Sequence, residues 1–293
     1  MTASAATEGA QPPVLGPGVI FVAGPAGAGK GTLATEIMKR YGLPPERCIS
    51  SGDVLRQALA RVESDPTYAA TFQKLHNINS DVRILSHPLV DPLVPELMEQ
   101  KAEVLRDFLA ERRGVPPETV DTQTTTQFEW FVFCMERRVY LPSVWLNSIF
   151  SAHLRSIPDL DSTPVILDGT PRRPDEAPFI LNLMRDAGMP FLHLFHMHVE
   201  DVEELVARTA RRNRSDDSAD AVRHSYAFYE GTIRKTIETL QELFPENTTN
   251  LDATLPPEVV TAAAFHALDH SEPKPVPADA ARRAAARLDL ALV

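Results

Sequence analysis

The chain has 293 residues, of which 43% are hydrophobic and 24% charged, as in ordinary globular proteins. This length suits one large α/β domain or two smaller ones. The formal net charge of -11 gives no general electrostatic attraction to nucleic acid or to an anionic membrane, so we expect neither as a partner.

Compartment signals in the sequence are consistent with one another. The two cysteines, Cys48 and Cys134, are too few for a disulfide framework and suit a reducing compartment. The apolar runs have strand length, so no transmembrane helix is predicted. Residues 1–18 are rich in proline and small residues and contain no arginine or lysine, which argues against a signal or transit peptide. We therefore expect a cytoplasmic protein with a flexible N-terminal tail.

Short apolar segments alternate with helical patterns along most of the chain. The predicted strands are Val19–Ala23, Arg47–Ser50, Val165–Asp168, Phe191–Val199 and Asn250–Asp252. The predicted helices are Gly29–Tyr41, Asp53–Val62, Leu89–Arg113, Pro142–Ser156, Arg173–Ala187, Val202–Arg212, Asp217–Leu243 and Pro256–Leu268. Because a helical pattern follows each strand, we expect an α/β fold with a five-stranded parallel sheet flanked by helices.

A glycine-rich segment, Gly24-Pro25-Ala26-Gly27-Ala28-Gly29-Lys30-Gly31-Thr32, joins the first predicted strand to the first predicted helix. Glycines in such a turn let successive N–H groups point inward, and the helix N-terminus adds partial positive charge. Lys30 supplies a point charge for β- and γ-phosphates, and the hydroxyl that suits Mg²⁺ is delayed to Thr32. The segment predicts a phosphate-binding loop.

Three later blocks accompany this loop: Ile49–Arg56 reads I-S-S-G-D-V-L-R, Val165–Arg172 reads V-I-L-D-G-T-P-R, and Arg208, Arg212 and Arg214-Ser215-Asp216-Asp217 follow. In this order, the four segments resemble the adenylate kinase and nucleoside monophosphate kinase family. That family has G-x-P-G-x-G-K-G-T, I-S-T-G-D-x-L-R, L-L-D-G-F-P-R, R-x-x-x-R and R-x-D-D. The resemblance implies a P-loop NTPase-like fold and ATP-dependent phosphoryl transfer to a nucleoside monophosphate, with ATP and Mg²⁺ as cofactors.

The resemblance also implies a role for each block in a reaction that needs in-line placement and cations rather than covalent help. It implies as catalytic residues Lys30, Arg172, Arg212 and Arg214. It implies an ATP site formed by Gly27, Ala28, Gly29, Lys30, Gly31, Thr32, Arg208 and Arg212. It implies a monophosphate site formed by Ser51, Arg56, Tyr140, Leu141, Gly169, Arg172, Glu176 and Arg214. Asp53 and Asp168 would position Mg²⁺ through water, which suits an ion that keeps several waters.

The stretch between the second and third predicted strands is longer than in the family. Val139-Tyr140-Leu141-Pro142 matches the family's G-x-L-V-P-like segment at a similar distance from the D-G-T-P-R block, and Pro88–Pro92 is a rival anchor. We prefer the first, which predicts an enlarged helical monophosphate-binding arm over 57–138, a candidate surface for a protein partner. The other predicted parts are a tail over 1–18, a kinase core over 19–56 and 139–269, and a C-terminal tail or appended helix over 270–293.

Departures from the family keep two alternatives open. Ser225 stands where the family has a phosphate-clamping arginine, and Arg223 lies about 200° away around a helix. The family's lid, a segment that closes over the donor, is reduced to Asn213 between Arg212 and Arg214. Glu176 stands where adenylate kinases have a glutamine that reads the acceptor base. A carboxylate only accepts hydrogen bonds, so Glu176 would favour an acceptor edge rich in donors. The alternatives are a kinase for another small acceptor and a nucleotide-binding module with little or no catalysis.

Two further groups of side chains are predicted to be structural. His193, His196 and His198 share one predicted strand, but no cysteine or acid lies at convincing metal-ligand spacing. The aromatic residues of the arm are predicted to form its core: Trp130, Phe131, Phe133 and Trp145.

Overall fold

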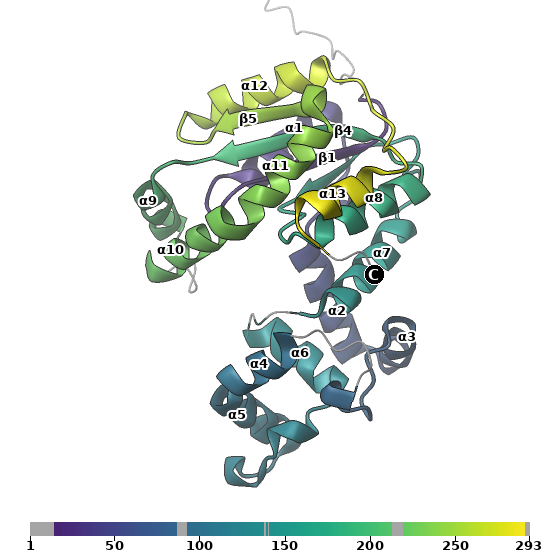
Figure 1. Ribbon diagram of the computed structural model, residues 1–293, viewed down its shortest axis with the longest axis vertical. Helices are drawn as coiled ribbons and strands as arrows, with labels where there is room; N and C mark the ends of the chain where they lie inside the picture. Colours follow the sequence, from purple (N-terminus) through teal and green to yellow (C-terminus); the bar gives the residue numbers. More distant parts are fainter. Residues whose placement is uncertain (1–14, 87–92, 138, 140, 213–218, 291–293) are drawn as a thin grey trace, which may run out of the picture. The chain divides into compact units, whose positions relative to one another are not determined.

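The computed structural model describes residues 15–86, 93–137, 139, 141–212 and 219–290 (Figure 1). The chain divides into two compact units, Met1–Ser50 with Ile157–Val293 as unit 1 and Ser51–Ser156 as unit 2. Two predicted site residues, Tyr140 and Arg214, lie outside the described residues, as do Asn213, Asp216–Asp217 and the rival anchor Pro88–Pro92.

Unit 1 is built on a five-stranded parallel sheet with strand order β2-β3-β1-β4-β5. Its strands are β1 (Val19–Ala23), β2 (Cys48–Ile49), β3 (Val165–Asp168), β4 (Phe191–His198) and β5 (Thr248–Asp252). All five lie where the sequence predicts them. The α/β fold class, with a parallel sheet flanked by helices, is confirmed.

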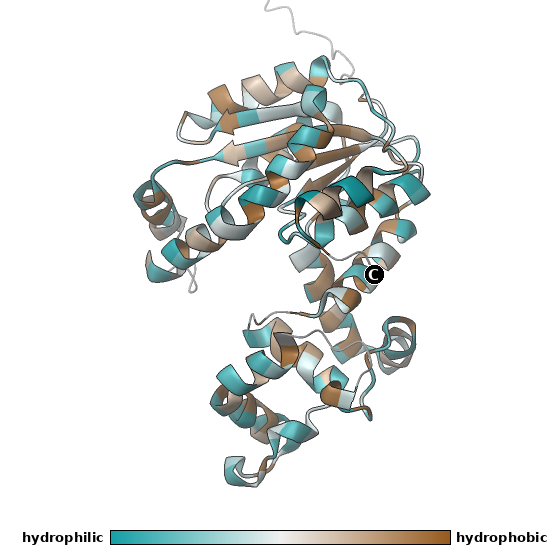
Figure 2. Cartoon of the chain, in the orientation of Figure 1, coloured by the Kyte–Doolittle hydropathy of each residue, from teal (hydrophilic) through white to brown (hydrophobic). Residues whose placement is uncertain are grey.

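Both faces of the sheet are covered, which explains why β1 is apolar and buried along its whole length (Figure 2). Ile20 and Val22 point into a core shared with α1 (Lys30–Tyr41) and α12 (Pro257–Asp269). Phe21, between them, points to the opposite face and stacks on Phe191 at a centroid distance of 5.2 Å. This pleat alternation therefore builds two cores from one strand.

The remaining helices of unit 1 are α8 (Glu176–Asp186), α9 (Val202–Arg212), α10 (Ala219–Phe228), α11 (Arg234–Leu243) and α13 (Ala280–Arg287). The single helix predicted over Asp217–Leu243 is divided, because a π-helical segment, Tyr229–Ile233, separates α10 from α11. The C-terminal segment forms an appended helix rather than a loose tail. Four buried alanines of α13 form the face that packs on α8: Ala280, Ala281, Ala284 and Ala285.

Unit 2 consists of helices α2 (Ser51–Ser64), α3 (Pro66–His76), α4 (Leu93–Gln100), α5 (Ala102–Arg113), α6 (Gln127–Arg137) and α7 (Ser143–Ser156). The predicted arm, 57–138, falls inside this unit, which is wider because α2 packs on α7. Its core is aromatic, as predicted, with Trp130 packed on Phe133 and Phe72 packed on Phe131. The predicted helix Leu89–Arg113 is wrong as one element, because α4 ends before Lys101 and α5 begins after it.

Within the part of the chain that the structure describes, no helix combines the length and the apolar character needed to cross a bilayer.

Candidate functional site

The glycine loop between β1 and α1 depends on glycine at three positions. Gly24, Gly27 and Gly29 have φ angles of 145°, 85° and 91°, a region that side chains other than glycine rarely adopt. A Cβ atom on Gly24 would collide with the carbonyl oxygen of Met197, and one on Gly27 would lie 3.0 Å from Thr209 Cγ2. The loop is therefore pressed directly against β4 and α9.

The N-terminus of α1 faces this loop. The helix begins after Gly29, which makes no side-chain cap, and the first helical hydrogen bond runs from Leu33 N to Gly29 O. The N–H groups of Lys30, Gly31 and Thr32 precede that bond, so helix geometry directs them outward as anion donors. Lys30 Nζ donates to Gly24 O at 3.0 Å and to Pro25 O at 2.8 Å, which places the ammonium group within the loop.

The end of β3 and the turn after it place Asp168 and Arg172 next to the glycine loop. β1 and β3 pair in parallel with Val22 beside Asp168, so their carboxyl ends meet at one edge. A Cβ atom on Gly31 would lie 3.7 Å from Asp168 Oδ2. A Cβ atom on Gly169 would lie 3.1 Å from Arg172 Nη2 and 3.4 Å from Lys30 Cε, so those two cationic side chains flank Gly169.

Arg172 is held by its own loop. Its Nε donates to Gly169 O at 2.7 Å, and its backbone N–H donates to Glu176 Oε2 at 2.8 Å. Glu176 is only 5% exposed, and burial raises the pKa of its carboxyl group. Glu176 thus fixes the turn that carries Arg172, a contact that the sequence did not indicate. Its reading of an acceptor base stays a prediction.

On the other side of the loop, α9 carries Arg208. Arg208 Nη1 donates to Ala253 O at 2.5 Å and its Nη2 donates to Glu204 Oε1 at 2.5 Å, which places it against the corner after β5. Leu205 and Thr209, on the same helix, pack on Gly27. The sequence analysis did not predict that Thr209 packs on Gly27, although Thr209 is adjacent to the predicted ATP-site residue Arg208. Arg212 is the last residue of α9, and its side chain lies outside the described part.

Three predicted site residues of unit 2, Ser51, Asp53 and Arg56, lie at the start of α2, and a fourth, Leu141, precedes α7. Arg56 Nη2 donates to Asp53 Oδ1 at 2.5 Å, and both side chains are exposed. Ser51 and Leu141 are buried. The predicted acceptor arginine and the predicted magnesium-positioning acid are therefore paired with each other in this structure.

The histidines of β4 form hydrogen bonds inside unit 1. His193 Nδ1 lies 2.7 Å from Ser271 Oγ and its Nε2 lies 2.9 Å from Thr249 Oγ1, and burial lowers its pKa to about 4. Among the described residues, no group of three or more histidines, cysteines and acids is arranged to hold a metal ion. These contacts support the structural role predicted for His193.

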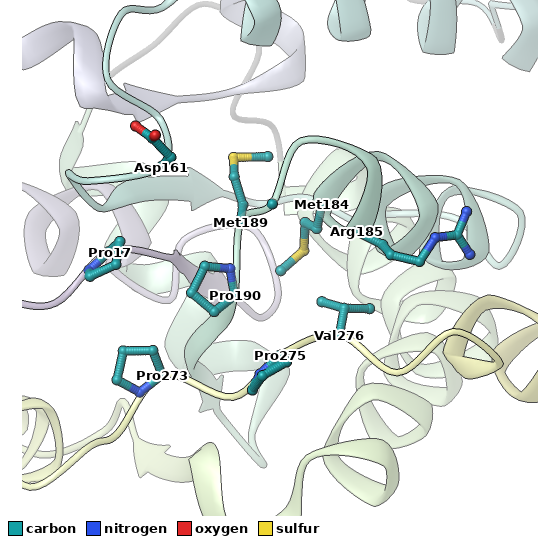
Figure 3. Close-up of a pocket in the computed structure, with 10 residues that line it drawn as sticks. Pro17, Asp161, Met184, Arg185, Met189, Pro190, Pro273, Pro275 and Val276 are labelled. Atoms are coloured by element: carbon teal, nitrogen blue, oxygen red, sulfur yellow. The ribbon is translucent and has the colours of Figure 1, made fainter.

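A pocket of about 400 Å³ lies at the amino ends of β1 and β4, opposite to the ends that the glycine loop follows (Figure 3). Pro17 and Pro190, which precede β1 and β4, line it together with Pro273, Pro275 and Val276 of the segment before α13. Because the strands are parallel, their amino ends are remote from their carboxyl ends, where Lys30 and Arg172 lie. The pocket is therefore separate from the candidate phosphate site.

Comparison with known proteins gives limited similarity. No protein-family model matches the chain. An adenylate kinase from Kosmotoga olearia is 56% identical over 41 residues, which are 14% of this chain and 18% of that adenylate kinase. The chain thus matches less than a fifth of that relative's length. A solved structure of deoxyadenosine kinase from M. mycoides with bound dATP is 15% identical, with a TM-score of 0.40 over 86% of this chain and 99% of that one.

Proposed function

We propose that the chain is an ATP-dependent nucleoside monophosphate kinase, which transfers the γ-phosphoryl group of ATP to a monophosphate and releases two diphosphates. One observation carries the proposal: the glycine loop, Lys30, Asp168 and Arg172 come together where β1 and β3 end. Phosphoryl transfer needs donors and cations arranged around a group whose charge spreads over its oxygens. The short stretch of identity with an adenylate kinase agrees with this chemistry.

The residues of unit 1 fit the phosphates of ATP. Three glycines with positive φ allow a closely wrapped backbone, and the uncapped start of α1 offers N–H donors. Lys30 would exchange the carbonyls of Gly24 and Pro25 for phosphate oxygens. Bound Mg²⁺ would neutralise charge on those oxygens, and Asp168 would hold waters of its shell. Arg172 would bind a phosphate of the acceptor through its two-pronged guanidinium group.

Among the residues of unit 2, Ser51, Arg56 and Leu141 are proposed to contact the acceptor monophosphate. The Arg56 side chain is 66% exposed and pairs with Asp53, whose side chain is 60% exposed, at the start of α2. An exposed pair of this kind contributes about 1 kcal/mol or less, so a phosphate can displace Asp53 at little cost.

A coupled phosphotransfer assay tests the proposal most directly. The purified full chain is supplied with ATP and a panel of nucleoside monophosphates, with and without Mg²⁺. We expect diphosphate formation with at least one monophosphate and its loss when Mg²⁺ is chelated. ATP binding without transfer to any acceptor would contradict the kinase and favour the second candidate.

That second candidate is a nucleotide-binding module with little or no catalysis. It is favoured by the contacts of Arg223, which lies two residues before Ser225, the predicted position of the family's phosphate-clamping arginine. Arg223 Nε and Nη2 donate to the carboxylate of Glu203 at 2.8 and 3.0 Å, and Nη1 donates to Asp220 at 3.2 Å. Arg223 is thus engaged on the surface of α9 and α10 instead of replacing the family arginine.

Replacing Glu176 with glutamine tests whether this residue reads the acceptor. Glutamine keeps an oxygen that can accept from Arg172 N–H, and it adds an N–H₂ donor. We expect Glu176→Gln to raise turnover of AMP relative to the other monophosphates in the same panel. An unchanged substrate ranking would restrict Glu176 to holding the Arg172 turn.

The same variant has a pH-dependent effect on stability. Burial raises the folded-state pKa of Glu176, so the stability present at acidic pH is lost as pH rises through that pKa. Glutamine has no charge to bury, so Glu176→Gln is expected to equal the parent protein at acidic pH and to exceed its stability near neutral pH. Denaturant melts between these limits measure the difference. Asp175→Asn, at the half-buried neighbouring position, is the matched control.

A further inference from the structure

Three side chains on α10 and at the start of the π-helical segment tie this part of the chain to the end of β4 and to the first turn of α9. They are spaced three residues apart, so they lie along one side of the helix. Arg223 binds Glu203 in the first turn of α9, and Tyr226 Oη donates to Val199 O at 3.0 Å. Tyr229 Oη lies 2.5 Å from His196 Nε2. Figure 1 shows α9 beside α10, with α11 continuing beyond it.

The contact between Tyr229 and His196 has a defined direction. Gln241 Nε2 donates to Asn250 Oδ1 at 2.8 Å, and His196 Nδ1 lies 3.1 Å from the same acceptor. His196 Nδ1 must therefore carry the ring proton, which leaves Nε2 as an acceptor for the Tyr229 hydroxyl. Both rings are buried, with Tyr229 2% and His196 6% exposed. Water therefore has little access to replace Tyr229 at this nitrogen.

The strand segment that Tyr229 holds also supports the phosphate loop. Met197, next to His196, places its carbonyl oxygen against Gly24, and its Cε would lie 3.6 Å from a Cβ on Gly29. The helix that follows β4, α9, packs Leu205 and Thr209 on Gly27 and directs Arg208 to Ala253. The tethers from α10 thus end on the two elements that border the glycine loop.

The change from α- to π-helix occurs at Tyr229, where the tether to His196 is made. Such segments occur frequently at functional sites. The hydrogen bonds that Tyr226 and Tyr229 make therefore restrain α10 against β4 and the residues that follow it.

We propose that Tyr229 is a positioning residue of the donor-nucleotide site: its hydrogen bond to His196 fixes α10 and, through it, the helix α9 that borders the phosphate loop. This inference rests on the proposed function, since it assigns ATP to that loop. Tyr229 does not touch the nucleotide and acts through His196 and α9.

Tyr229→Phe in the full chain tests this role, with binding of a fluorescent ATP analogue as the primary measurement. Loss of one hydrogen bond in the network is expected to weaken the affinity about threefold to tenfold. The KM for ATP should rise in parallel while kcat at saturating ATP stays unchanged, as for an interaction equal in ground and transition states. Hydrogen exchange in Val202–Arg212 should accelerate. His196→Gln, which keeps an acceptor near Tyr229, should retain more affinity than His196→Leu.

Tyr41→Phe is the matched control, because Tyr41 Oη also makes one hydrogen bond within unit 1, to Asp269 at 2.7 Å, away from α9 and α10. It should lower stability without changing ATP affinity. Equal affinities and equal α9 exchange in Tyr229→Phe and Tyr41→Phe would overturn the inference. If the parent protein binds the ATP analogue without turnover, only the proposed kinase activity fails, and the affinity comparison still decides the role of Tyr229. If it does not bind the analogue, both proposals fail.

Discussion

Lys30→Ala is expected to abolish measurable phosphoryl transfer while the fold remains intact. Lys30 is the side-chain cation inside the glycine loop, where its Nζ donates to Gly24 O and Pro25 O. Removing one preorganised donor from a site of this kind lowers turnover about a hundredfold to a thousandfold. Alanine has the highest helix propensity, so α1 should form normally. The coupled assay measures the loss, and a thermal melt measures the fold.

Lys39→Ala is the control, since Lys39 lies on the same helix, has a side chain that is 67% exposed and pairs with Glu36. Exposed pairs of this kind contribute about 1 kcal/mol or less, so activity and stability should hardly change. Full activity in Lys30→Ala would refute the kinase assignment, because no other residue is proposed for the role of the cation inside the glycine loop.

Ser225→Arg is expected to raise turnover by about tenfold or more, on the usual scale for one added transition-state donor. By the resemblance in sequence, Ser225 is predicted to stand where the adenylate kinase family has a phosphate-clamping arginine. Arg223 does not replace it here, because its guanidinium group is bound to Glu203 and Asp220. The measurement is kcat at saturating ATP and monophosphate.

Ala227→Arg separates a placed cation from a general charge effect. Ala227 is exposed on the same helix, and two residues correspond to about 200° of rotation, so the added charge points elsewhere. It should leave turnover unchanged. A neutral or harmful result for Ser225→Arg would mean that another arginine already reaches the transferring group. A bound-state structure with an arginine nitrogen about 3 Å from those oxygens would identify it.

Local sequence signals predicted the sheet and the phosphate loop because each depends on neighbouring residues. β1 is an unbroken apolar run, and the glycines that follow it meet the backbone requirement of the turn. Helix α3 was missed because Asp65-Pro66 reads as a break, whereas Asp65 caps the helix and Pro66 starts it. The break between α4 and α5 at Lys101 was not predicted, because no glycine or proline marks it in the sequence. Hydrophobic periodicity alone therefore did not determine where these helices begin and end.

The candidate site shows the same limit. Lys30, Asp168 and Arg172 follow strands that end at one edge, so their meeting could be predicted from topology. The bond from Arg172 N–H to Glu176 depends on how one turn folds back, which spacing does not specify. The pair between Arg56 and Asp53 could have been predicted, since residues three apart on a helix lie on the same side of it. The tether between Tyr229 and His196 joins elements far apart in sequence and required the structure.

The docking of α13 has a consequence for how the molecule opens. Its face toward α8 consists of alanines, whose methyl groups bury little apolar area, and its ion pairs with α11 join exposed side chains, Arg287 with Glu242 and Lys235 with Asp289. A helix held in this way detaches at lower free energy than the central sheet does. Pro273, Pro275 and Val276 lead into α13 and form one wall of the proline-lined pocket. Within this segment Lys274 forms two backbone hydrogen bonds with Phe191 of β4, so detachment of α13 frees the Val276 side of the pocket while the segment around Lys274 stays on the sheet.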